Sequence, residues 1–272
     1  MSQAYGVVAT AESSGGDVSA LISRLNQAEA LVRAGDSDSL ARATSIVADV
    51  GVAAEAALSA GRQSMTFRYV SIAATLVVLG IVGVLVYFYG SKLFLTLQLR
   101  SNRSNGELER RRSLEKEFKI VSLALIGLLS VITVYPMLSA GWMTEPFSEL
   151  GVMGPSGKLG DYPSQVAVNE EFSLLVYVGD HEEHSGYYRV SLKLGDQNSD
   201  VSDAKPLDVI PIDYWNVFLL KGGSFTQPVT LSMFRAGPDQ CIVFELSMFE
   251  PKTNTFVYKS WIQLWINVIA NE

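Results

Sequence analysis

Residues 151–160, GVMGPSGKLG, come close in composition to a phosphate-binding loop. Such a loop needs a glycine, four further residues and then Gly-Lys-Ser/Thr, so that backbone N–H groups cradle the phosphates. Counting back from Lys158 places Val152 where the first glycine is needed, and Leu159 stands in place of the magnesium-binding hydroxyl. The following Asp-Tyr-Pro also breaks any helix. We therefore predict a Gly-Pro-Ser-Gly β-turn between two strands, with no nucleotide or other cofactor.

The stretch DHEEH at residues 180–184 offers two imidazoles and three carboxylates, which are groups that bind metals. Zinc sites of the His-Glu-x-x-His type need a helix that places both histidines on one face. Only two residues separate the histidines here, and strand-like segments lie on both sides. We predict a solvated hairpin turn. The alternative is a weak cation site formed by His181, Glu182, Glu183 and His184.

Covalent catalysis has no candidate residues in this sequence. The chain has one cysteine, Cys241, which lies inside an apolar run and has no second cysteine for an internal disulfide. Both histidines lie in the stretch at 180–184, and no Gly-x-Ser-x-Gly motif occurs. The sequence therefore predicts a protein that is not an enzyme.

Two long stretches, residues 69–91 and 120–144, contain no Asp, Glu, Lys or Arg. A helix of about 20 apolar residues crosses a hydrocarbon core of about 30 Å. Core helices of soluble proteins are seldom apolar on every face over such a length. We predict two transmembrane helices, over residues 67–91 and 120–144.

The segment between these helices, residues 92–119, is basic and contains Arg110, Arg111 and Arg112. Residues 90–119 carry eight Lys and Arg residues, whereas residues 1–66 carry four. The positive-inside rule then places this helical loop in the cytoplasm of a plasma-membrane protein and both terminal parts outside. We interpret the three arginines as an anchor to anionic lipid, the alternative being a docking site for a cytoplasmic partner.

The N-terminal part divides into a tail and a helical hairpin. Residues 1–16 are rich in Ser and Gly, and we predict that they are disordered. Helical spacing of apolar residues over 17–66, broken at Gly35, predicts two helices that reach the membrane, with Gly61 as a possible joint. No secretion signal is visible. Either the first membrane helix exports the tail, or a signal peptide has been removed before Met1, which we favour.

After Thr144 the pattern alternates with a period of two residues, and turn residues separate about seven short segments. Residues 145–272 therefore predict an antiparallel, immunoglobulin-like β-sandwich, which makes the chain an α+β membrane protein. Residues 144–272 carry 17 acidic and 8 basic residues, a balance that does not suit binding to nucleic acid.

The last strand carries the aromatic residues that attract most interest. Phe256 and Tyr258 share one face by simple alternation, and Trp261 and Trp265 are assigned to the other, so both faces are apolar. One interpretation is a central strand packed on both sides. The alternative is that one face meets a partner or the membrane surface, with Trp261 and Trp265 as anchors.

The segment FSELGVMGPSGKLGDYPSQVAVNEEFSLLVYVGDHEEHSGYYRVSLKL resembles the ectodomain of an archaeal membrane-protein family, domain of unknown function 1616. The shared features are a Phe-x-Glu-Leu start, a Gly-Pro-x-Gly-Lys turn, Tyr-Pro, a His-Glu turn and a Tyr-x-Val strand. The resemblance covers residues 147–250 and the preceding membrane helix. It departs at residues 151–153 and at an insertion-like stretch, 196–216. It implies a membrane-anchored sandwich and no activity.

These observations favour a cell-envelope protein that holds a β-sandwich outside the membrane and binds other envelope or membrane proteins. Two alternatives remain open. The chain is an accessory subunit of a larger membrane complex, for which small residues of the first span permit close helix packing. Otherwise it is an extracytoplasmic sensor of a ligand or cation. Membrane lipid is an expected partner in each case.

Overall fold

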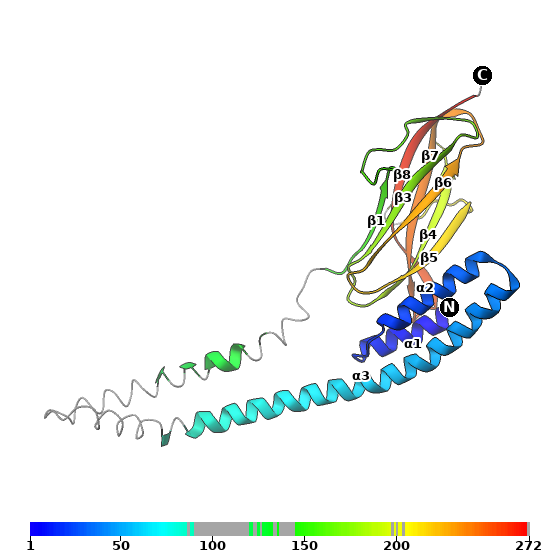
Figure 1. The fold of residues 1–272 in the computed structure, drawn as a ribbon. Helices are drawn as coiled ribbons and strands as arrows, with labels where there is room; N and C mark the ends of the chain where they lie inside the picture. Colours follow the sequence, from blue (N-terminus) through cyan, green and yellow to red (C-terminus); the bar gives the residue numbers. More distant parts are fainter. Residues whose placement is uncertain are drawn as a thin grey trace. The chain divides into compact units, whose positions relative to one another are not determined.

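A computed structural model describes residues 1–85, 88–89, 120–121, 124–125, 127–132, 135, 145–196, 199, 201–202 and 205–270 (Figure 1). The chain forms two compact units, one of Met1–Gln63 with Pro146–Glu272 and the other of Ser64–Glu145. The predicted basic loop at 92–119, with Arg110, Arg111 and Arg112, lies outside the described residues. So does most of the predicted span at 120–144.

Residues 1–85 form three helices: α1 (Ser2–Ser13), α2 (Ser19–Ala34) and α3 (Ser37–Leu85). The prediction of a disordered tail at residues 1–16 is wrong. Helix α1 forms because Tyr5, Val8 and Ala11 recur at helical spacing and are all buried. The Ser and Gly residues of the tail favour a prediction of disorder, and the apolar stripe is too narrow to outweigh them.

The predicted helical hairpin is confirmed, and its turn follows from local chemistry. Gly35 ends α2 in the left-handed region at φ +77°, which a glycine adopts without steric cost. The Asp36 carboxylate accepts a hydrogen bond from the Ser39 N–H at 2.9 Å, and this bond satisfies a free donor at the start of α3. Asp17 accepts from the Ser19 N–H at 2.9 Å at the start of α2.

Gly61 is a point of close packing within α3 and not a joint between two helices. A Cβ atom added there would lie 2.5 Å from the Gly16 nitrogen and 2.7 Å from the Ser14 oxygen. A Cβ at Gly16 would likewise lie 2.6 Å from the Ala57 oxygen. The two glycines let α3 pass directly against the turn that follows α1.

Helix α3 is the one helix among the described residues that is long and apolar enough to cross a membrane, judged by length and composition. Beyond Arg68 its exposed side chains carry no charge and most are apolar, with Val70, Val77 and Ile81 all more than half exposed. Such exposure suits lipid better than water.

The described residues of the C-terminal part form a β-sandwich of eight strands. Their bounds are β1 (Ser148–Met153), β2 (Gln165–Ala167), β3 (Glu171–Asp180), β4 (Gly186–Gly195), β5 (Asp213–Leu219), β6 (Ser224–Ser232), β7 (Gly237–Glu250) and β8 (Thr255–Ile269). One sheet has the order β1-β3-β6 and the other β2-β8-β7-β4-β5. The pairings are antiparallel, as predicted, except that β2 runs parallel to β8.

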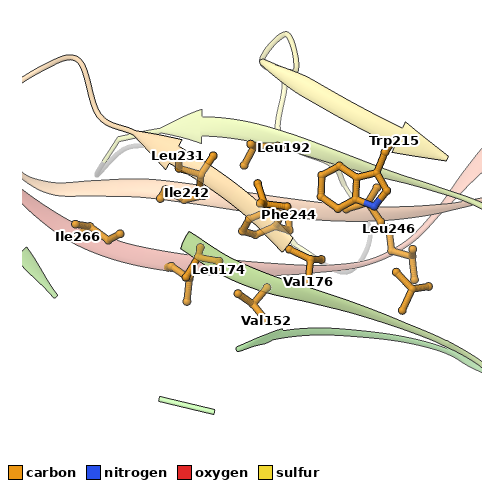
Figure 2. Packing of buried hydrophobic residues seen from close by; sticks show 14 of the residues in the cluster. Val152, Leu174, Val176, Leu192, Trp215, Leu231, Ile242, Phe244, Leu246 and Ile266 are labelled. Carbon is orange, nitrogen blue, oxygen red and sulfur yellow. The ribbon is translucent and has the colours of Figure 1, made fainter. Parts of the chain in front are cut away.

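One core lies between the two sheets (Figure 2). Val152, Leu174 and Val176 of the smaller sheet pack toward Phe244 and Ile266 of the larger one, and all five side chains are buried. Trp215 of β5 joins this core, with its ring 6.5 Å from the ring of Phe244. The inward face of each strand is therefore the apolar face that alternation predicts.

A second core joins the helices to the outer face of the larger sheet. Tyr5 of α1 packs among Tyr187, Phe218 and Phe249, which come from β4, β5 and β7. The Tyr187 and Phe218 rings stack 4.0 Å apart. The hairpin and the sandwich are consequently one packed body, which sequence periodicity did not reveal.

Candidate interaction surface

The turn at 154–157 has the predicted geometry. The Gly157 N–H donates to the Gly154 oxygen at 2.9 Å, and Gly157 has φ +76°. A side chain at Gly154 would collide with the backbone oxygen of Asp161. A strand, β2, follows the turn, so no helix N-terminus lies here to hold a phosphate.

The stretch at 180–184 connects the two sheets and is not a hairpin turn, because β3 and β4 lie in different sheets. His181 stacks on Phe147 at 4.4 Å and lies 3.3 Å from the Glu149 carboxylate. His184 and Glu183 are exposed. Within the described part of the chain, no group of three His, Cys, Asp or Glu side chains could hold a metal ion.

The Glu182 carboxylate makes polar contacts that do not involve the two histidines. Its carboxylate accepts from the Ser148 hydroxyl at 2.7 Å and lies 3.4 Å from the Lys259 amino group. These bonds tie the inter-sheet connection to β1 and β8. Glu182 therefore has a structural role here, and the four candidate metal ligands do not converge.

Asp180 is fully buried at the end of β3. Its Oδ1 accepts from the Glu182 N–H at 2.9 Å, and its Oδ2 is without a hydrogen-bond partner. Burial raises the pKa of Asp180 to about 6, although backbone hydrogen bonds from Glu182 and Gly186 oppose the rise. Asp180 thus holds a proton more tightly in the folded chain than in the unfolded one.

Glu12 of α1 binds the same connection from the helical side. Its two carboxylate oxygens accept from the Ser185 N–H at 2.9 Å and from the Ser185 hydroxyl at 2.8 Å. The Tyr5 hydroxyl donates to the Ser185 oxygen at 2.6 Å. Ser185 is therefore held by α1 at all three of its polar groups.

Helix α2 lies along the edge strand β5 (Figure 1). Asn26 pairs with the backbone of Phe218, and Glu29 accepts from the Asn216 amide at 2.6 Å. Arg33 reaches Asp213 at 3.3 Å, at a half-exposed pair. Side chains at positions i, i+3 and i+7 of α2 thus cover the edge, which protects it from pairing with another chain.

Strand β8 differs from simple alternation by one residue. Leu246 pairs with Ser260 whereas Ser247 pairs with Tyr258, so Lys259 is an extra residue in β8. The bulge places Trp261 and Trp265 on the same outer face as Phe256 and Tyr258. The predicted assignment of the tryptophans to the opposite face is therefore wrong.

The outer face of β8 is only partly covered. Phe256 packs into the helix–sheet core, and the Tyr258 hydroxyl donates to the Ser202 oxygen at 2.9 Å. Trp261 is half-buried, and Trp265 is 42% exposed opposite the buried Cys241. Burial raises the pKa of the Cys241 thiol to about 11, which makes it inert.

Leu207, in the insertion-like stretch around 196–216, is held by a buried ion pair that sequence reasoning missed. Lys193 and Glu245 form a buried ion pair at 2.7 Å on the outer face of the sheet. The Lys193 amino group donates to the Leu207 oxygen at 2.6 Å, and the Leu207 N–H donates to the Glu245 carboxylate at 2.5 Å. Both backbone groups of Leu207 are thereby fixed, and its side chain is buried against Cys241 and Val243.

Directly after Leu207, three apolar side chains are exposed: Val209 at 44%, Ile210 at 85% and Ile212 at 54%. We call residues 208–213, Asp-Val-Ile-Pro-Ile-Asp, the apolar tip. The signal was present in the sequence as an apolar run between two aspartates. Such a run also suits a short buried strand, so the sequence alone does not predict its exposure.

No protein-family model and no curated protein sequence matches this chain. A CARDB domain from Pyrococcus furiosus, solved with di-metal ions, is 13% identical, with a TM-score of 0.31 over 46% of this chain and 89% of that one. A chain of the human seminal plasma complex of zinc 2-glycoprotein and prolactin inducible protein is 11% identical, with a TM-score of 0.31 over 46% of this chain and 98% of that one. A beta-glucosidase from Listeria innocua is 12% identical, with a TM-score of 0.26 over 46% of this chain and 16% of that one. At these values the comparisons assign no function to the chain.

Proposed function

We propose that this chain is a non-enzymatic, membrane-anchored envelope protein whose immunoglobulin-like sandwich binds a protein partner outside the cytoplasm. The observation that carries the proposal is the set of large apolar side chains left exposed on the sandwich after the helices have docked. They include Leu159 at 77%, Ile210 at 85%, Phe234 at 73% and Trp265 at 42%. Large apolar side chains that stay exposed on a folded domain can mark a protein-binding surface.

These four side chains lie toward one end of the sandwich, whereas Phe147, which is 51% exposed, lies at the other end. The Val168 N–H donates to the Ile269 oxygen and the Asn169 N–H to the Met233 oxygen, both at 2.9 Å, so the ends of β6 and β8 meet at the end where these four lie. Leu159 and Phe234 follow β1 and β6, and Ile210 follows β4. The other end carries the connection at 180–184, which α1 holds through Ser185.

The membrane part of the proposal rests on α3 and on the basic residues of the sequence. Helix α3 begins in the hairpin and continues without a break into the apolar stretch. A second span at 120–144 and a cytoplasmic loop at 92–119 follow from the uncharged run and the Lys/Arg asymmetry. The anchoring of Arg110, Arg111 and Arg112 to anionic lipid belongs to the same proposal.

Topology is tested with single cysteines at Ser104 and Lys252 in intact cells and an impermeant thiol reagent. Labelling at 252 alone is the expected result, and the buried Cys241 gives little background. Labelling at 104 alone would reverse the topology and remove the extracytoplasmic function.

Binding is tested by purifying the full-length chain in mild detergent with its stoichiometric partners. Trp265→Ser with Ile210→Ser should release a sandwich-bound partner, whereas Val77→Ser on α3 should not. Release by the α3 variant alone would favour the accessory-subunit alternative. A partner lost in neither variant would count against binding through the sandwich.

A further inference from the structure

We infer that the apolar tip, residues 208–213, is the element that contacts the partner, and that it docks into an apolar recess rimmed by Lys and Arg side chains. This inference rests on the proposed function and adds the contact site and the chemistry of the partner. It follows from three properties of the tip: its exposure, its fixed backbone and its charge.

The tip presents apolar side chains with little freedom to withdraw them. Ile210 is 85% exposed, although burial of an isoleucine side chain is favourable. Pro211 fixes its own φ near −65° and restricts Ile210 to extended backbone. An isoleucine held outward in this way has the shape of a hydrophobic anchor that enters a pocket.

The buried ion pair fixes the base of the tip. Leu207 is held at both its N–H and its oxygen by Glu245 and Lys193, and the Val209 N–H donates to the same Leu207 oxygen at 2.9 Å. Burying such an ion pair has a desolvation cost that gives little net stability. What the pair provides is a fixed backbone immediately before the exposed side chains, which lowers the entropy lost on binding.

The negative charge around the apolar tip indicates the class of partner. Asp208 and Asp213 flank the apolar residues, and residues 196–213 contain five aspartates and one lysine. Arg33 forms an ion pair with Asp213, but both side chains are half exposed, so the pair offsets little of the negative charge. An anionic membrane surface or a second copy of this acidic chain would be repelled, whereas Lys and Arg around an apolar recess would be attracted.

The test is photo-crosslinking from position 212 of the full-length chain in its native membranes. The expected adduct is a protein whose crosslinked segment, located by mass spectrometry, has an excess of Lys and Arg. Ile210→Ser and Asp208→Lys should each lower the yield about tenfold, and about 0.5 M salt should lower it several-fold. Val52→Ser, which removes a 73% exposed apolar side chain from α3, should leave the yield unchanged. An unchanged melting temperature shows that the variants fold.

Other outcomes separate this inference from the proposed function. An adduct with lipid, with a second copy of the chain or with an acidic segment contradicts the basic-partner inference. So does a yield unaffected by Asp208→Lys. A protein adduct from position 265 but none from position 212 also overturns the inference while leaving the proposed function in place. No protein adduct from either position counts against both.

Discussion

Asn26 of α2 and Phe218 of β5 are joined by two hydrogen bonds. The Asn26 amide donates to the Phe218 oxygen at 2.7 Å, and the Phe218 N–H donates to the Asn26 side-chain oxygen at 2.9 Å. A side-chain amide here takes the place that a neighbouring strand would occupy. It closes the edge of the larger sheet and fixes the hairpin to it.

Asn26→Asp should weaken the docking of the hairpin. A carboxylate cannot donate to the Phe218 oxygen, so a hydrogen bond becomes a repulsive contact, at a cost of about 1–3 kcal/mol. Thermal unfolding of the full-length chain in detergent micelles, followed by tryptophan fluorescence, measures the loss. The exposed neighbour provides a control, since Gln27→Ala should change little. Equal melting temperatures for the two variants would show that the pair adds no stability.

Gly61→Ala should force α3 away from the turn after α1, because its Cβ would lie 2.5 Å from the Gly16 nitrogen. We expect a loss of about 1–3 kcal/mol, as for other overpacked contacts. Gly51→Ala in the same helix meets nothing within 4 Å and should gain up to about 1 kcal/mol from helix propensity. The two substitutions therefore shift the melting temperature in opposite directions. A gain at both positions would contradict the close contact.

Asp180→Asn should stabilise the chain at neutral pH. The folded pKa of Asp180, about 6, lies above the ordinary value for aspartate, 3.8, so the stabilising effect of the bound proton is present below pH 3.8 and is lost as pH rises through 6. The asparagine variant lacks this loss of stability, so its advantage over Asp180 should grow from near zero at about pH 4 to about 2–3 kcal/mol at about pH 7.5. Glu183→Gln, an exposed change in the same connection, should show no such growth. A difference that is constant with pH would refute the assignment to Asp180.

Lys193→Met should be strongly destabilising, by about 3–5 kcal/mol, because it leaves the Glu245 carboxylate buried without its partner. The double change Lys193→Met with Glu245→Leu should recover part of this loss but not all, because the backbone groups of Leu207 stay unpaired. Chemical denaturation of the three chains gives the comparison. Additive losses would show that the two charges do not act as a pair.

Substitutions of Trp215 and Trp265 should differ in their effects on stability and on partner binding. Trp215→Ala removes a core ring that is 4% exposed and should cost about 3–5 kcal/mol. Trp265→Ala, at 42% exposure, should cost less than about 1 kcal/mol and should instead weaken partner binding. Melting temperatures and co-purification of the partner test the two effects separately. A large stability loss for Trp265→Ala would assign it to the core.

Several features of this protein were determined by the sequence alone. The uncharged run after Arg68 predicts the apolar part of α3, Gly35 predicts the hairpin turn, and residues 154–157 predict a β-turn. Strand alternation predicts the inward faces of the sandwich. Each of these depends on contacts between residues a few positions apart, or on a period that the chain repeats, so a local pattern is sufficient.

The tertiary structure alone decided the rest. Helix α1 is stabilised by hydrogen bonds of Glu12 and Tyr5 with Ser185, a residue far along the chain. The extra residue Lys259 moved both tryptophans to the outer face, because a shift of one residue reverses every later side chain in a strand. The apolar tip is exposed because Lys193 and Glu245, 52 positions apart, hold its base. These contacts join residues that no local pattern relates, so only the folded chain brings them together.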